Sequence, residues 1–159
     1  MLQRNWNTEE KFWKNLQPIL LERDWKRVSF NYGSKDMVSL ERGVYMVLIS
    51  TSHFSGINPF KNLTTPFYVG MSTKLRQRFA THTNTRSDKD NLIKRLGFFS
   101  KKAIFFYKEL PDYTREQLLY IEQSLIDLFG GSGNQSNSVS IKNKEVILAT
   151  FKEGEEHAT

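Results

Sequence analysis

The chain contains no cysteine among its 159 residues. This absence excludes disulfide bonds, zinc sites built from thiolates and catalysis by a cysteine nucleophile. Histidine is also scarce, because the chain has only His53, His82 and His157, and these do not form a cluster of metal ligands in the sequence.

Long apolar runs are missing as well. No stretch of about 18 apolar residues occurs, so the sequence predicts no transmembrane helix and no membrane partner. The N-terminal residues, Met1 to Trp6, are followed by Glu9 and Glu10 rather than by the apolar region of a signal peptide. We therefore expect a cytoplasmic protein.

Positive charge is what the chain has in excess. The formal net charge is +6, and residues 71–110 carry ten of the lysines and arginines but only three acidic residues. A basic segment of this kind favours a polyanionic partner such as nucleic acid. A solvated basic face without a partner is the alternative reading of the same pattern. The length and the hydrophobic content of 38% indicate one domain with a substantial core.

Hydrophobic periodicity predicts an α+β domain, in which helices pack on a small sheet. Apolar runs predict strands over 44–49, 67–69 and 103–107, and residues 50–66 are interpreted as an inserted loop. Helices are expected over 8–27, 73–83, 88–96 and 115–129. The expected N-terminal caps are Ser72 or Thr73, Ser87, and a capping box formed by Thr114 and Gln117, with Gly97 and Gly130 ending two of the helices.

Glu122 is the most informative single residue. It lies among Leu118, Leu125 and Ile126 on the apolar face of the helix expected from residue 115. A carboxylate in an apolar stripe is unfavourable unless it is paired or binds a metal. A buried ion pair or a hydrogen bond to a tyrosine is one explanation of this carboxylate, and a metal ligand is the other.

Arg78 and His82 are four residues apart and share one side of a helix. This pair could bind a phosphate and move a proton, or it could be a surface arginine beside a half-buried histidine. Tyr45 and Tyr68 lie within expected strands, where tyrosine is also common as a core residue. Taken singly, none of the four decides between a structural and a functional role.

Their order along the chain is more specific. Gly43-Val44-Tyr45 and Tyr68-Val69-Gly70 come first, Arg78 follows Tyr68 by ten residues, and His82 lies one helical turn further on. Glu122 follows on a later helix, and Asn134 lies twelve residues after it, with Asn137 as the alternative asparagine. This ordered set resembles the GIY-YIG nuclease family, over roughly residues 43–137.

The resemblance implies a small, mainly antiparallel three-stranded sheet flanked by helices. Residues 1–40 would form an N-terminal helical extension packed on the core, residues 41–151 the nuclease-like domain, and residues 152–159 a flexible tail. The sequence departs from the usual family pattern in three ways. The two tyrosines are 23 residues apart, Met71 replaces a common lysine, and some forty residues precede Gly43. Such features look more like restriction-type than repair-type members.

The resemblance also implies a metal-dependent DNA endonuclease. Glu122 would bind a single Mg²⁺ or Mn²⁺, Arg78 would bind the scissile phosphate, and Tyr45, with His82, would orient or deprotonate the attacking water. Tyr68 would complete the hydrogen-bond network, and Asn134 would position the substrate or the end of the Glu122 helix. The expected contacts to double-stranded DNA come from the basic residues Lys74, Arg76, Arg86, Lys94, Arg95, Lys101 and Lys102.

Two other functions fit the same residues. One is a non-catalytic nucleic-acid-binding module on the same fold, and the other is a basic protein-interaction domain. The sequence does not indicate a recognition site or an oligomeric state.

Overall fold

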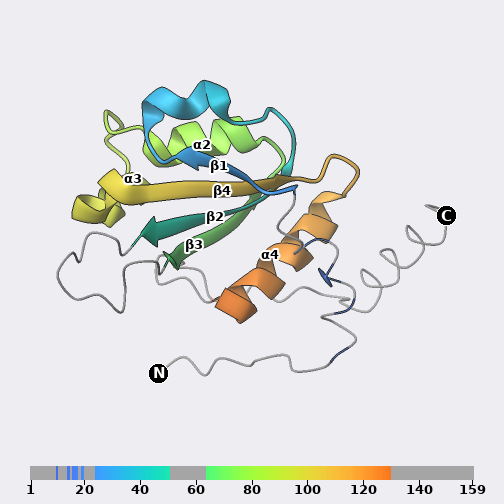
Figure 1. The fold of residues 1–159 in the computed structure, drawn as a ribbon. Coiled ribbons are helices and arrows are strands. Elements are labelled where there is room, and N and C mark those ends of the chain that lie inside the picture. The colour runs from blue at the N-terminus through green and yellow to red at the C-terminus, as the bar shows by residue number, and fades with distance from the viewer. Residues whose placement is uncertain are drawn as a thin grey trace.

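The sheet has four antiparallel strands in the spatial order β1-β4-β2-β3 (Figure 1). The structure is a computed structural model that describes residues 24–50 and 64–129, together with Glu10, Lys14, Leu16, Gln17 and Ile19. The strands are β1 (Lys26–Ser29), β2 (Gly43–Ser50), β3 (Thr64–Ser72) and β4 (Ala103–Glu109). β2 and β4 are the central strands, whereas β1 and β3 are the two edges.

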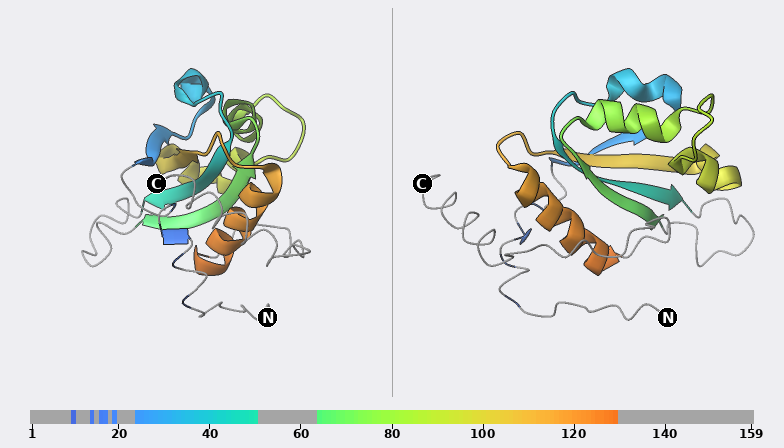
Figure 2. Two further views of the ribbon diagram at one scale, coloured as in Figure 1. Left: turned by 90° about the vertical axis from the view of Figure 1, so that its right-hand side faces the viewer. Right: turned by 180° about the vertical axis from the view of Figure 1, so that it is seen from behind.

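Helices cover both faces of this sheet. The 3₁₀ helix η2 (Tyr32–Met37) and the helix α2 (Leu75–Thr83) lie on one side, and α4 (Arg115–Phe129) lies on the other (Figure 2). The short helix α3 (Leu92–Leu96) continues into the 3₁₀ helix η5 (Gly97–Lys102). This pair lies at the end of the sheet where β2 ends and β4 begins (Figure 1).

Successive side chains of β2 point to opposite faces of the sheet, so the core consists of one cluster on each face. Tyr45 and Val47 point into a cluster on the α2 side, while Val44 and Met46 point into a cluster on the α4 side. β4 alternates in the same way, because Phe105 and Tyr107 join the first cluster and Phe106 packs against the second. A central strand that is buried on both faces reads as a continuous apolar run, as β2 does.

The structure confirms the α+β class, the antiparallel sheet and its flanking helices. The expected strands lie within β2, β3 and β4, and the helix predicted from residue 115 is α4. Its capping box is also confirmed, because the Thr114 backbone donates to Gln117 Oε1 at 2.9 Å and the Gln117 backbone donates to Thr114 Oγ1 at 3.2 Å.

The number of strands was predicted wrongly, since the sheet has four and not three. The additional strand, β1, includes residues 26 and 27, which were expected to be helical. Only Val28 of this strand is buried, so its alternation with the buried Phe30 is too short to stand out in the sequence. Its pairing with β4 decides its conformation. The helical expectation for 8–27 holds at the described positions from Glu10 to Ile19.

Two helix starts also differ from the prediction. Lys74 is the N-cap of α2 and makes no side-chain capping bond, because Ser72 still belongs to β3. Asn91, not Ser87, caps α3, and its side chain accepts a hydrogen bond from the Lys94 backbone. Residues 88–90 therefore remain in the connecting loop. Gly97 ends α3 as expected, with a φ of 53° that favours glycine.

Several predictions fall on residues outside the described ranges. These are the body of the inserted loop, the Gly130 cap, Asn134, Asn137 and the C-terminal tail. The inserted loop was predicted to extend to residue 66, but β3 already begins at Thr64. In the part of the chain that is described, no helix combines the length and the apolar character needed to cross a membrane.

Candidate functional site

A hydrogen bond between Tyr45 and His82 lies at the centre of the candidate site. The Tyr45 hydroxyl and His82 Nε2 are 2.7 Å apart, and both residues are buried. Tyr45 comes from the central strand β2, while His82 lies in the last turn of α2. Phe79, one turn before His82, packs in the core and holds this helix on the sheet. The pair is therefore set by two rigid elements.

Tyr68 extends this pair toward the edge of the sheet. Its ring lies parallel to that of Tyr45, with centroids 6.0 Å apart, and meets the His82 imidazole edge-on at 5.4 Å. A hydrogen bond between the two tyrosines contributes to the raised pKa of Tyr45. Tyr68 is half-buried, whereas Tyr45 exposes only 1% of its surface. Tyr68 is therefore the more accessible of the two hydroxyl groups.

Gly70 makes room for the Tyr45 ring. It is the partner of Tyr45 in the register between β2 and β3. A Cβ atom at position 70 would lie 2.4 Å from both Cζ and the hydroxyl of Tyr45, which is far inside van der Waals contact. Gly43 has a similar role, because a Cβ atom there would lie 1.9 Å from the carbonyl oxygen of Lys108 on β4. The glycines of both tripeptides are thus needed for close approach.

Glu122 reaches the site from the other side of the sheet. α4 packs on the cluster that contains Val44 and Val69, the face opposite to Tyr45. However, β3 is an edge strand, and Glu122 is close enough to its free edge to accept a hydrogen bond from the Met71 backbone. The carboxylate also interacts electrostatically with Tyr45 and Arg78. Glu122 is therefore within electrostatic range of Tyr45, although the two residues lie on opposite faces of the sheet.

The pKa values of three groups in the site, those of His82, Glu122 and Tyr45, differ from their ordinary values. Burial, together with the charges of Arg78 and Arg95, lowers the pKa of His82 to about 4, so that its imidazole is neutral at pH 7. Burial raises the pKa of Glu122 to about 7, although the Met71 hydrogen bond and the charge of Arg78 oppose this change. Burial and the neighbouring Tyr68 also raise the pKa of Tyr45.

Arg78 is the common electrostatic neighbour of these three groups. Its positive charge lowers the pKa values of Tyr45, His82 and Glu122. The side chain of Arg78 is exposed, although the helix that carries it is anchored by the buried residues Leu75 and Phe79. An exposed guanidinium near a buried hydroxyl, a buried imidazole and a half-buried carboxyl group is suited to binding a phosphate.

The expected DNA-binding residues differ in whether their side chains already form bonds within the protein. Arg76 donates to the backbone carbonyls of Val38, at 2.8 Å, and Asp36, at 3.0 Å, and so fastens α2 to η2. Lys94 donates to the carbonyls of Ser87 and Lys89 in the loop before α3. Arg95 forms an ion pair with Asp90 at 3.4 Å.

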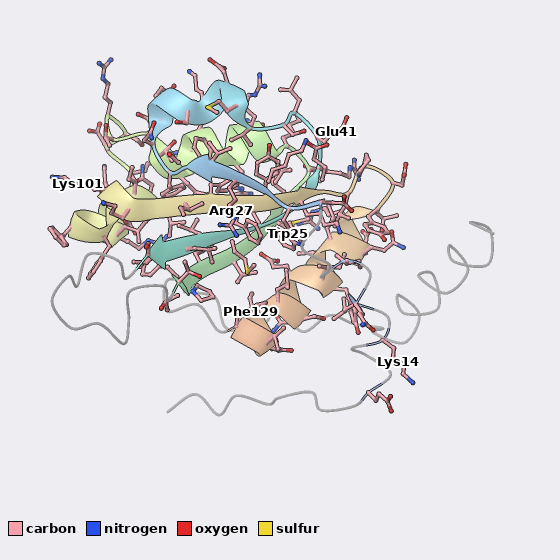
Figure 3. The ribbon with its side chains drawn as sticks, in the orientation of Figure 1. Lys14, Trp25, Arg27, Glu41, Lys101 and Phe129 are labelled. Atoms are coloured by element: carbon pink, nitrogen blue, oxygen red, sulfur yellow. The ribbon has the colours of Figure 1, made fainter. Side chains whose placement is uncertain are left out.

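The other four of these basic residues, Lys74, Arg86, Lys101 and Lys102, are exposed. Figure 3 shows Lys101 at the end of the sheet where β4 begins. Exposed lysine and arginine side chains can approach a phosphate backbone without first giving up a bond to the protein. They are therefore better placed for DNA contact than Arg76, whose bonds hold α2 against η2.

Of the six expected catalytic residues, Tyr45, Tyr68 and His82 contact one another, Arg78 and Glu122 interact electrostatically with Tyr45, and Asn134 lies outside the described ranges. Sequence reasoning did not identify Gly70 or the Met71 backbone as parts of the site. Gly70 is visible in the second tripeptide, but its role depends on the β2–β3 register. The Met71 hydrogen bond comes from the main chain, so no side chain signals it.

No protein-family model matches the chain, and no curated protein matches it. The geometry of the site is therefore the main ground for assigning a function.

Proposed function

We propose that the protein is an endonuclease that hydrolyses DNA phosphodiester bonds with a single divalent cation, in the manner of the GIY-YIG nucleases that its sequence resembles. The observations that carry this proposal are the direct contacts among Tyr45, Tyr68 and His82, together with the electrostatic interactions of Arg78 and Glu122 with Tyr45. These residues come from four different elements, so their convergence depends on the fold and not on sequence proximity.

The hydroxyl groups and the imidazole form a hydrogen-bonded chain. Neutral His82 can accept a hydrogen bond at Nε2 from the Tyr45 hydroxyl, and Tyr45 is in turn linked to Tyr68. A water molecule near Tyr68 would be oriented by the tyrosine pair for attack and proton loss. Tyr45 thus shares the role first expected for it with the more exposed Tyr68.

Glu122 is the residue that would hold Mg²⁺ or Mn²⁺. Its raised pKa fits this role, because a nearby cation would favour the ionised carboxylate that burial disfavours. The described residues contain no group of three or more acidic or histidine side chains that could bind a metal. Glu122 therefore fits a site in which one protein carboxylate binds the cation. When bound, such a cation supplies positive charge beside the phosphate and the leaving oxygen.

Arg78 would bind the scissile phosphate and stabilise the charge that develops on it. Removing a comparable electrostatic donor from an active site typically slows the reaction by about 10²–10³-fold. Its position one turn before His82 on α2 places the guanidinium on the same side of the helix as the imidazole. Phosphate binding and proton transfer would therefore be aligned by a single rigid helix.

A plasmid-cleavage assay tests the proposal. Supercoiled DNA should be converted to nicked and linear forms with Mg²⁺ or Mn²⁺, and a chelator should stop the reaction. Glu122→Gln, prepared identically, controls for contaminating nucleases. Cleavage by this variant at the wild-type rate would contradict the assignment of the metal to Glu122.

A specific observation favours the non-catalytic binding module as the second candidate. Tyr45 exposes 1% of its surface, and its hydroxyl is already bonded to His82, so it does not meet solvent directly. If the protein binds DNA but cleaves none with any divalent cation, this second function is the better one. Steep salt dependence of binding would separate both candidates from a protein-interaction domain, because phosphate contacts release counterions.

A further inference from the structure

Two exposed phenylalanines stand beside two exposed lysines in η5. Phe98 exposes 74% of its surface and Phe99 exposes 37%, and Lys101 and Lys102 follow them after Ser100. We call these four residues the aromatic–basic ridge. A phenylalanine this exposed gains little from folding, since burial of its ring would stabilise the protein by about 1.5–3 kcal/mol. Its exposure therefore points to a role outside the protein core.

The ridge is held by local structure. Gly97 ends α3 with a left-handed φ of 53°, and its backbone N–H donates to the Ile93 carbonyl. The chain then turns into η5, where the Phe98 and Phe99 rings meet edge-to-face with centroids 5.7 Å apart. Leu92 and Leu96 anchor α3 in the core. The exposed rings are thus carried by an anchored element.

The ridge lies on the same part of the molecule as the candidate site. Arg95, on α3 directly before η5, is near enough to His82 to lower its pKa. β4 begins at Ala103, immediately after η5, and reaches Tyr107, the register partner of Tyr45, four residues later. Four residues of a strand span about 13 Å.

The positive charge of the ridge indicates the kind of ligand that it would bind. Lys101 and Lys102 favour a polyanion, and an aromatic ring beside them matches the pattern of surfaces that bind single-stranded nucleic acid, where bases stack on aromatic side chains. In an intact duplex the base faces are covered by their neighbours. Stacking therefore requires a base that is unpaired or displaced from the helix.

We propose that Phe98 stacks on an unpaired base some nucleotides away from the scissile phosphate, so that the substrate is DNA with a locally unpaired segment. This inference rests on the proposed nuclease function and narrows its substrate class. Lys101 and Lys102 contact the phosphates that flank the stacked base, while Phe99 supports the Phe98 ring from the side.

Binding measured in chelator tests the stacking without cleavage. The probes are two 30-base-pair duplexes, one fully paired and one with a central four-base bubble that contains 2-aminopurine. The wild type should bind the bubble about tenfold more tightly and quench its fluorescence. Phe98→Ala should lose about that factor on the bubble, within the range typical of a base–aromatic stack, and little on the paired duplex.

Two further variants make the result specific. Phe98→Trp should retain both the preference and the quenching, because it keeps an aromatic face. Met37→Ala is the matched control, since Met37 is equally exposed, at 71%, but lies on η2. It should bind both probes like the wild type. Circular dichroism checks that all variants are folded.

Three outcomes would overturn the proposal. These are equal affinity of the wild type for the two duplexes, an equal loss on both probes in Phe98→Ala, and Phe98-dependent binding to anionic lipid vesicles with DNA affinity unchanged. The nuclease function has its own readout, because the same duplexes can be incubated with Mg²⁺. Cleavage without any preference for the bubble would remove only the stacking proposal. Bubble-specific binding without cleavage would remove only the nuclease.

Discussion

The two faces of the sheet are filled by different kinds of side chain. On the α2 face, five of the twelve buried core residues are aromatic. Phe105 stacks on Tyr45 with ring centroids 4.9 Å apart, and Phe79 meets the Phe105 ring edge-on at 5.0 Å. On the α4 face, most of the buried side chains are aliphatic, as with Val44, Leu118 and others of the second cluster. The aromatic face contains the buried hydrogen bond of the candidate site.

The two kinds of side chain have different roles, because aromatic rings can position polar groups whereas aliphatic side chains only pack. Rigid aromatic rings have few torsions and fixed shapes, so they can hold a hydroxyl and an imidazole at a set distance. Aliphatic side chains fill volume and stabilise the fold, but they provide no polar group to orient. Glu122 is a polar residue of the α4 side that interacts with the site, and it does so because β3 is an edge strand.

Lys108 shows what a buried charge does on the aliphatic face. It exposes 7% of its surface, and its ammonium group donates to the Ile19 carbonyl at 3.0 Å. Burial lowers its pKa, although Asp24 opposes this effect. This bond ties the N-terminal segment to β4. The polar group therefore serves the fold here, whereas polar groups on the other face form the site.

The largest expected effect follows from Glu122→Gln, which removes the one carboxylate that links the α4 face to the site. Because a hard cation requires an ionised oxygen ligand, cleavage should fall by more than about 10³-fold. DNA binding and the melting temperature should remain close to wild type. The measurement is plasmid cleavage together with thermal unfolding, and Glu116→Gln, an exposed substitution in the first turn of the same helix, is the control.

Arg78→Ala should have the next largest effect. It removes positive charge that influences Tyr45, His82 and Glu122 together, so activity should fall by about 10²–10³-fold. Raising the Mn²⁺ concentration should not restore it, because the missing group binds the phosphate. Gln77→Ala, at an exposed position of α2, should behave like wild type. Full rescue by Mn²⁺ would contradict a phosphate-binding role.

Gly70→Ala and Leu118→Ala compare the two faces directly. The first places a methyl group where the Tyr45 ring lies, and a displacement of about 1 Å can reduce activity by about 10²-fold. The second leaves a cavity on the aliphatic face and should lower the free energy of unfolding by about 2–5 kcal/mol. The activity of its folded fraction should nevertheless stay near wild type.

Cleavage rates normalised to the folded fraction, determined by urea unfolding, check this contrast. If Leu118→Ala loses activity as severely as Gly70→Ala, the two faces are not separable and the aromatic face has no special role.

Much of this architecture could be predicted from local patterns. The apolar runs of β2 and β4, the capping box before α4 and the Gly97 turn are all determined within a few residues. β1 was missed because its conformation depends on pairing with β4, which is some 80 residues away in the sequence. The spacing of Arg78 and His82 likewise predicted a common helix face, and both residues lie on α2.

The position of Glu122 could not be derived from spacing alone. Its helix packs on the opposite face of the sheet, and its approach depends on β3 being an edge strand. Strand order is a property of the whole fold, since it follows from long-range pairing and not from any local motif.

The smallest expected effect concerns pH, and it tests whether Glu122 is the metal ligand. Burial raises the pKa of this carboxyl from 4.5 to about 7, so the folded protein holds the proton more tightly than the unfolded chain does. The resulting contribution to stability is complete below pH 4.5 and is lost as the pH rises through 7. A cation binds only the ionised form, so Mg²⁺ affinity should rise about tenfold between pH 6 and pH 8 and then level off. Isothermal titration calorimetry at three pH values measures this rise, and proton release should accompany binding at pH 6. Glu122→Gln should show no such dependence, while Glu116→Gln should retain it. An affinity that stays constant from pH 6 to pH 8 would show that the metal is held elsewhere than on Glu122.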